Sequence, residues 1–121
     1  MPLVVHGIPN CNTVKKARTW LEERGLAYTF HDFKKQGVPE AALDDWLARH
    51  GWETLVNRAG TTWRQLDEAT KAGVTDAVSA RALMLAKPSV IKRPVVAWGA
   101  ARGDQVTVGF KPEQFEAAAG A

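Results

Sequence analysis

The chain has 121 residues, a length that suits one domain and allows a hydrophobic core without disulfide bonds. Hydrophobic residues make up 45% of it and charged residues 24%, and no apolar run approaches the ~20 residues of a membrane-spanning helix. The formal net charge of +3 comes from scattered lysines and arginines, so nucleic-acid binding is not predicted. The N-terminus lacks the pattern of a secretory signal, and we expect a cytoplasmic protein with no membrane contact.

The first third of the chain predicts a strand, a helix and a second strand. Residues 3–7 form a short apolar run that is typical of a buried strand in a parallel region. Helical spacing of apolar residues follows, with Asn12 or Thr13 as the expected N-cap and Gly25 as a left-handed C-cap. Residues 27–33 favour a strand. Together these segments predict a βαβ unit.

The middle of the chain predicts helices alone. One helix begins at Pro39 and ends at Gly51, a short one covers about 61–66, and a longer one covers about 75–86. The apolar residues that repeat at helical spacing in the longer helix are Val78, Ala82 and Leu85.

The last third predicts an antiparallel hairpin and a final helix. The strands cover 95–98 and 105–108, and the helix covers 112–119 with proline at its start. The order β-α-β, helical insert, β-β-α is the thioredoxin arrangement with an enlarged middle. We therefore predict an α/β fold with a mixed sheet, in a single thioredoxin-like domain over 1–121 with a helical insert at about 36–89.

The single cysteine, Cys11, is the residue whose position indicates chemistry. It directly precedes the first predicted helix, where unpaired N–H groups and the helix dipole favour a negative charge. Because the thiolate is the nucleophilic form of cysteine, this position predicts a reactive thiol. The alternative is a small buried cysteine without chemical function.

Three familiar arrangements do not fit the residues around this cysteine. Val14 stands where a Cys-x-x-Cys pair needs its second cysteine, and Arg18 comes one residue too late for a phosphatase loop of the form Cys-x5-Arg. His6 lies in a predicted buried strand, so a core role is favoured over a Cys–His dyad. One cysteine and three widely spaced histidines predict no metal site.

Three segments carry a resemblance to a known family. Residues 7–13 (GIPNCNT), followed by KKA at 15–17, resemble the signature loop of the ArsC-like, arsenate-reductase-related family, in particular its YffB/Spx branch. Residues 57–66 (NRAGTTWRQL) and 91–96 (IKRPVV) resemble two further segments of that branch, in the same order. The resemblance implies a thioredoxin-like fold with a helical insert.

The resemblance also implies a set of site residues. Cys11 is the implied catalytic cysteine, and the X-Pro bond at Pro94, which is cis in thioredoxin-like folds generally, is implied to face it. Arsenate reductases of this family surround the cysteine with three arginines that bind the oxyanion and keep the sulfur ionised. The first of these matches Arg93, which the resemblance therefore assigns as a second catalytic residue; an ordinary ion pair is the alternative.

The other two arginines match less well. The second falls at Asn57 or Arg58, of which we choose Arg58, and the third falls at Lys111. A lysine offers a point charge where arginine offers a flat bidentate fork, and this difference weakens the case for arsenate as the substrate. Solvated surface roles are the alternative for both residues.

The leading functional prediction is a glutathione-dependent thiol reductase acting on a disulfide or a small oxyanion. Because the chain has no resolving cysteine, an external thiol must release the adduct, and we expect glutathione as a co-substrate, with no bound cofactor and with glutaredoxin as a further partner. The residues expected to bind substrate or glutathione are Asn10, Asn12, Thr13, Lys15, Arg58, Pro94 and Lys111.

Two alternatives remain at this point. One is arsenate reduction, which belongs to the same chemical class. The other is an Spx-like transcriptional regulator that binds RNA polymerase. That branch usually senses redox state through a Cys-x-x-Cys pair, which Val14 removes here.

Overall fold

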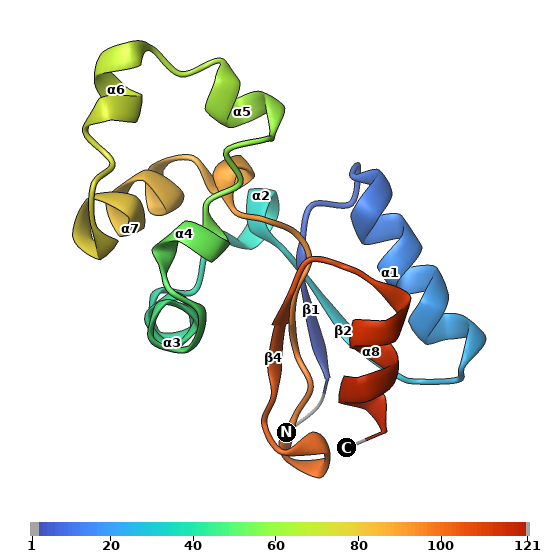
Figure 1. Cartoon of the computed structure of the whole chain (residues 1–121). Coiled ribbons are helices and arrows are strands. Elements are labelled where there is room, and N and C mark those ends of the chain that lie inside the picture. The colour runs from blue at the N-terminus through green and yellow to red at the C-terminus, as the bar shows by residue number, and fades with distance from the viewer. Residues whose placement is uncertain (1–2, 121) are drawn as a thin grey trace. The chain divides into compact units, whose positions relative to one another are not determined.

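The computed structural model describes residues 3–120, which form two compact units (Figure 1). The helical unit is Gly37–Lys92, and the sheet unit contains the described residues on both sides of it in the chain. The helical unit overlaps the predicted insert at about 36–89, while the single domain over 1–121 stays a prediction. Within residues 3–120, no helix combines the length and the apolar character needed to cross a bilayer.

The sheet unit contains four strands and the helices connected to them. Its elements are β1 (Val4–Gly7), α1 (Asn12–Glu23), β2 (Thr29–Asp32), α2 (Phe33–Gln36), β3 (Val95–Ala97), the 3-10 helix η2 (Ala100–Arg102), β4 (Val106–Val108) and α8 (Pro112–Ala119). The strand order is β2-β1-β3-β4. β1 pairs parallel with β2 and antiparallel with β3, and β3 pairs antiparallel with β4. The predicted mixed sheet and its βαβ and ββα parts are confirmed.

The second strand is shorter than predicted, because the chain turns into a helix at Phe33. Asp32 is the last strand residue, and its Oδ1 accepts a hydrogen bond of 2.9 Å from the backbone N–H of Lys34. Such a bond from a side chain to a nearby N–H starts a turn and competes with strand pairing. The strand prediction over 27–33 is therefore wrong for Phe33, whose side chain is buried, and it is also wrong for residues 27–28, because β2 begins at Thr29.

Aromatic contacts hold α1 and α8 beside the strands (Figure 1). The Phe115 ring meets the rings of Trp20 and Trp98 edge-on, with centroids 5.5 and 5.1 Å apart. Edge-on contacts of this kind add to the free energy that burial of apolar area provides. The buried residues of this core are Leu3, Val5, Ala17, Trp20, Leu21, Val96, Trp98, Phe115 and Ala118.

The ends of α1 follow two different signals. Gly25 has a φ of +67°, and the chain closes the helix there with hydrogen bonds from Gly25 N–H to Glu22 O and from Leu26 N–H to Leu21 O. This is the hydrogen-bond pattern of a glycine that ends a helix, as predicted. The start of α1 differs from the prediction, because its N-cap is Cys11 and not Asn12 or Thr13.

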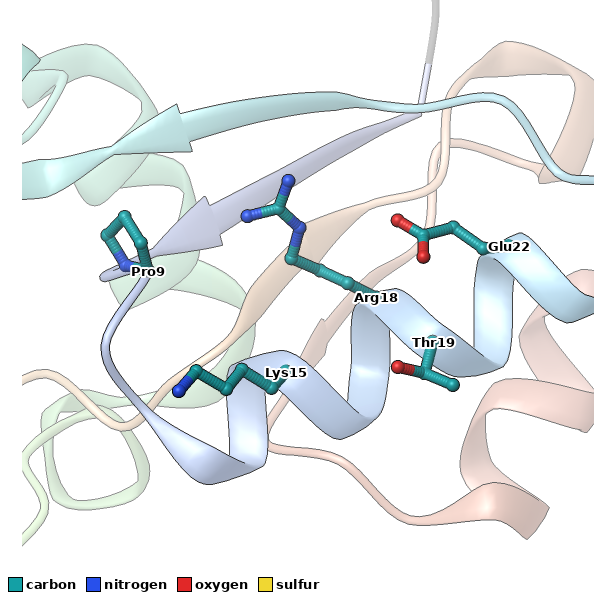
Figure 2. Close-up of a pocket in the computed structure, with 5 residues that line it drawn as sticks. All are labelled: Pro9, Lys15, Arg18, Thr19 and Glu22. Atoms are coloured by element: carbon teal, nitrogen blue, oxygen red, sulfur yellow. The ribbon is translucent and has the colours of Figure 1, made fainter.

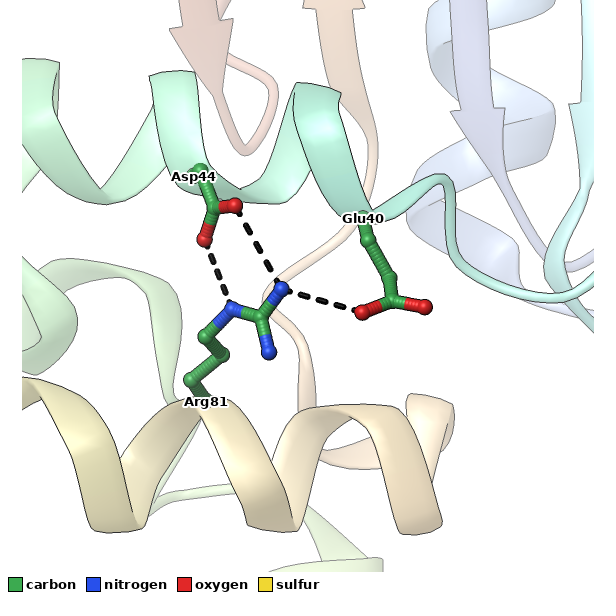
Figure 3. Close-up of polar contacts among 3 residues, drawn as sticks. All are labelled: Glu40, Asp44 and Arg81. Carbon is green, nitrogen blue, oxygen red and sulfur yellow. Dashed lines mark hydrogen bonds and ion pairs between the residues drawn. The ribbon is translucent and has the colours of Figure 1, made fainter.

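The helical unit is built from short helices. Its elements are α3 (Glu40–His50), α4 (Trp52–Leu55), α5 (Thr61–Arg64), α6 (Glu68–Ala72), α7 (Ala77–Ala86) and the 3-10 helix η1 (Pro88–Val90). The three predicted helices correspond to α3, α5 and α7. Figure 3 shows how Arg81 of α7 is tied to α3: its Nε donates to Asp44 at 2.6 Å and its Nη2 donates to Glu40 at 3.1 Å.

The predicted buried face of α7 is wrong. Val78 is 78% exposed, whereas Ala80, Leu83 and Met84 are buried. Both sets have helical spacing, because this helix is apolar on more than one side. Ala82 is exposed as well. Periodicity alone does not choose between two apolar stripes, and the packing of α7 against α3 and α4 makes that choice.

Candidate active site

The loop between β1 and α1 is held by a close approach of the strand end to the helix. A Cβ atom on Gly7 would lie 2.9 Å from Cγ2 of Val14, closer than side chains normally pack. Only glycine therefore lets the end of β1 lie against the first turn of α1 without displacing Val14. The segment that carries Cys11 starts from this contact.

Cys11 is itself the N-cap of α1. Its backbone is extended, with φ −140° and ψ 123°, and its carbonyl accepts the hydrogen bond of Lys15 N–H at 2.9 Å. The predicted caps Asn12 and Thr13 are wrong, since Asn12 is already the first helical residue and both side chains are exposed. The sulfur consequently takes the position in which a capping side chain faces the free N–H groups.

Opposing effects act on the acidity of this thiol. Burial of the sulfur raises the pKa of Cys11, but the backbone N–H of Val14, the Arg93 guanidinium and the N–H of Thr13 lower it, and the resulting pKa lies below that of an ordinary thiol. The N–H groups of Val14 and Thr13 lower the pKa because they stabilise the charged thiolate more than the neutral thiol. Cys11 remains partly exposed and within reach of a reactant.

Arg93 reaches the sulfur from the other half of the sheet unit. It directly precedes β3 and is half-buried, and the Arg93–Pro94 peptide bond is cis, as the resemblance implied. Pro94 is buried, and its carbonyl accepts a hydrogen bond of 2.9 Å from Gly109 N–H. The structure therefore brings Cys11 and Arg93 together, although they are far apart in the chain.

His6 is a core residue, as predicted. It is 7% exposed, and its Nδ1 lies 2.9 Å from the carbonyl oxygen of Val95. Its ring lies near those of His31 and Phe33, with centroids 5.3 and 6.3 Å away. Burial, opposed by the hydrogen bond to Val95 and assisted by His31, lowers the pKa of His6 to about 4. The ring is therefore neutral at physiological pH.

The remaining predicted residues divide between the two units. Asn10, Thr13 and Lys15 are exposed beside Cys11, as is Asn12. Lys111 is the exposed N-cap of α8 in the sheet unit. Contacts with substrate stay a prediction for all of them.

Arg58 belongs to the helical unit, where its contacts are with neighbours in the chain. Its Nη2 lies 3.9 Å from the Glu53 carboxylate, and its guanidinium lies over the Trp52 ring at 5.0 Å. Both contacts are typical of an exposed arginine, and its role at a substrate stays a prediction. No group of three or more His, Cys, Asp or Glu side chains in the described part of the chain could hold a metal ion.

One feature of the sheet unit escaped the sequence analysis. A hollow of about 420 Å³ lies on α1 next to the cysteine loop (Figure 2). The residues that line it are Pro9, Lys15, Arg18, Thr19 and Glu22. Three of them, Lys15, Arg18 and Glu22, share a side of α1, a spacing that the sequence contains but that does not by itself indicate a cavity.

The fold and the site define a thioredoxin-like protein with one cysteine, of lowered pKa, at the start of its first helix. The ArsC family model matches residues 6–118, and the chain belongs to the ArsC family. This confirms the family that the sequence motifs indicated.

Individual relatives narrow the likeness to the YffB branch. A solved structure named YffB protein is 52% identical, with a TM-score of 0.87, and the match covers 96% of this chain and 97% of that one. A Brucella melitensis protein described as arsenate reductase (ArsC) related is also 52% identical, with a TM-score of 0.72 and coverage of 97% and 93%. An uncharacterized Haemophilus influenzae protein is 34% identical over 116 residues, which are 96% of this chain and 97% of that protein. The chain is an ArsC-family protein similar to YffB.

Proposed function

We propose that this protein is a glutathione-dependent thiol reductase whose nucleophile is the Cys11 thiolate. One observation carries the proposal: the partly exposed sulfur lies with the N–H groups of Val14 and Thr13 and the Arg93 guanidinium, which together lower its pKa. A lowered pKa increases the thiolate fraction at neutral pH and also makes the sulfur a better leaving group.

The proposed reaction consists of two exchanges. The Cys11 thiolate attacks the glutathione sulfur of a mixed disulfide R–S–S–G, the S–S bond breaks, and its electron pair leaves with R–S⁻, which takes a proton from water. The thiolate of a second glutathione then attacks the Cys11–S–S–G bond, releasing G–S–S–G and restoring the Cys11 thiolate. The disulfide R–S–S–G is thus reduced to R–SH, the added glutathione is oxidised, and it leaves together with the glutathione unit of the substrate as G–S–S–G.

The residues around the sulfur have distinct roles in these exchanges. The N–H groups of Val14 and Thr13 stabilise the negative charge when Cys11 is free and again when it leaves. Arg93 adds a positively charged partner for the thiolate, and its guanidinium also suits a glutathione carboxylate. Glutaredoxin is a second proposed thiol donor for the release step, because the chain holds no other cysteine.

Mass spectrometry tests the proposed intermediate. Incubation with oxidised glutathione at neutral pH should add one glutathionyl group to Cys11, and added reduced glutathione should remove it. Cys11→Ser should lower the rate of mixed-disulfide reduction by roughly a thousandfold or more, since it removes the nucleophile. A folded protein that forms no adduct at neutral pH contradicts the proposal.

Arsenate reduction is the second candidate, because Arg93 lies at the sulfur and a relative is described as arsenate reductase related. Arsenate would take two electrons from two glutathione thiols and become arsenite and water. An assay with arsenate, glutathione and glutaredoxin decides this point. Turnover no faster than that of Cys11→Ser eliminates arsenate as a substrate.

A further inference from the structure

The hollow on α1 begins beside the cysteine loop, at Pro9, and follows one side of the helix. Lys15, Arg18 and Glu22 are spaced three and four residues apart, which places them on one side of α1, and Cys11 is the N-cap that precedes the helix. Figure 2 shows Arg18 between Lys15 and Glu22, with its guanidinium directed toward the strands. The volume of about 420 Å³ is within the range of roughly 300–1,000 Å³ that small-molecule sites have.

Arg18 is held in place by groups that leave its outer nitrogens available. Its Nε donates to Tyr28 Oη at 2.8 Å, and its guanidinium lies over the Phe30 ring, 4.2 Å from the centroid. Neither Nη atom of Arg18 forms a hydrogen bond or an ion pair within residues 3–120. A flat, oriented guanidinium with two free N–H₂ groups is suited to a carboxylate.

The charges in the hollow favour an anion. The Lys15 ammonium has no ion-pair partner among the described residues, and it lies one turn nearer to Cys11 than Arg18. The Glu22 carboxylate is already engaged, because it accepts a hydrogen bond of 2.6 Å from Tyr28 Oη. Glu22 keeps its negative charge, so the two cations and this carboxylate leave the hollow with a net positive charge.

Distance selects which residues a glutathione group on Cys11 can reach. At about 1.5 Å per residue, Lys15 and Arg18 lie about 6 and 10 Å along the helix from Cys11, and Glu22 lies about 16 Å away. Glutathione is joined to Cys11 through the sulfur of its central residue, so each of its two carboxylates extends from the disulfide by one residue only, and the γ-glutamyl arm is the longer of the two. Side chains on a helix lean toward its N-terminus, which brings Lys15 and Arg18 closer still. The longer arm of glutathione on Cys11 therefore extends toward Lys15 and Arg18, whose own side chains bridge the remaining distance, and Glu22 is the farthest of the three.

We propose that this hollow binds a carboxylate of the glutathione moiety, with Arg18 and Lys15 as its recognition residues and Tyr28 and Glu22 as positioning residues for Arg18. The proposal rests on the proposed function and makes it specific, because it predicts that the protein prefers glutathione to thiols without a carboxylate. It also assigns a role to Arg18, which sequence patterns left unexplained.

Steady-state kinetics with two substrates test the recognition. The mixed disulfides of one thiol with glutathione and with 2-mercaptoethanol present the same S–S bond with and without carboxylates. Arg18→Gln and Lys15→Gln should each lower kcat/KM for the glutathione disulfide by about tenfold or more, relative to the 2-mercaptoethanol disulfide, since each removes a charge-assisted contact. Lys16→Gln removes an exposed charge from the same turn of α1 without lining the hollow, and should leave the ratio unchanged. Equal losses for both substrates, or no loss, overturn the proposal.

A binding measurement separates this inference from the proposed function. S-methylglutathione cannot react, and calorimetry with the Cys11→Ser protein measures its affinity without redox chemistry. Arg18→Gln in that background should weaken binding by about tenfold. Lys15→Gln provides a second variant whose folding should be unaffected, since the exposed Lys15 side chain forms no hydrogen bond or ion pair within residues 3–120. Unchanged affinity in both variants overturns the subsite even if the enzyme reduces disulfides, whereas selective weakening supports it even if reduction is absent.

Discussion

Different interactions stabilise the interior of each of the two units. The sheet unit has a continuous strand ladder and an aromatic core in which Phe115 meets Trp20 and Trp98. In the helical unit, α4, α5 and α6 span only four or five residues, lengths at which a helix is not stable by itself. Local hydrogen bonds support such helices: the Asp67 side chain, for example, caps α6 by accepting a hydrogen bond from the backbone N–H of Thr70.

This difference indicates where geometry has to be exact for chemistry. Cys11 and Arg93 come from distant parts of the chain, and only the sheet and its core keep them together. Arg58, in the helical unit, contacts residues a few positions away in the chain. Long-range packing therefore supports the thiolate, and the following variants test that contrast.

The largest effect is expected in the aromatic core. Phe115→Ala should lower the free energy of unfolding by about 3–5 kcal/mol, because it removes a fully buried ring and leaves a cavity. Urea denaturation measures this loss. Glu113→Gln, exposed on the same helix, is the matched control and should have little effect. A loss below about 1 kcal/mol for Phe115→Ala would contradict the importance given to this core.

The next effect concerns pH and the buried His6. The pKa of His6 is lowered from 6.5 to about 4 in the folded protein, so the unfolded chain binds a proton between these values and the folded chain does not. Stability should therefore be complete above pH 6.5 and fall as the pH decreases toward 4, by roughly 3 kcal/mol in total. Thermal unfolding from pH 7.5 to 4 measures the slope. An unchanged slope in His6→Gln would assign it to other groups.

A third comparison sets two arginines of the expected oxyanion site against each other. Arg93→Gln should raise the pKa of Cys11, since the guanidinium is one of the groups that lower it, and should slow thiol exchange at neutral pH by about ten- to a hundredfold. Arg58→Gln should change both quantities less. The ultraviolet absorbance of the thiolate, recorded against pH, gives the pKa directly. Equal changes of the Cys11 pKa in the two variants would contradict the conclusion that Arg93 of the sheet unit acts on the thiolate more strongly than Arg58 of the helical unit.

The smallest effect is expected on the outer side of α7. Val78→Ala should change the free energy of unfolding by less than about 0.5 kcal/mol, because the side chain is 78% exposed. Denaturation by urea is again the measurement. A loss of more than about 1 kcal/mol would mean that Val78 is covered after all, as the sequence pattern suggested.

Much of the fold was predictable because its signals are local. Gly25 after α1, Pro39 and Gly51 around α3, and Pro112 at the start of α8 mark helix ends through backbone geometry that other residues do not share. Apolar runs indicated the strands. The candidate nucleophile was predictable for the same reason, since a cysteine between a buried strand and a helix is a pattern of neighbouring residues.

The rest depended on contacts between distant segments. Two apolar stripes on α7 were equally regular, and packing buried Leu83 rather than Val78. Likewise, nothing near Arg18 in the chain indicates that Tyr28 and Phe30 would hold its guanidinium at the edge of a hollow.

The amino-acid sequence by itself determined the order of the elements, most of their ends and the position of the lone cysteine, because these follow from the backbone preferences of adjacent residues. Only the tertiary structure decided that Arg93 lies at the Cys11 sulfur and that its charge, with the helix-end N–H groups, outweighs the effect of burial on the thiol pKa. Electrostatic interactions act through space, and the distances between charges are known only once the chain has folded.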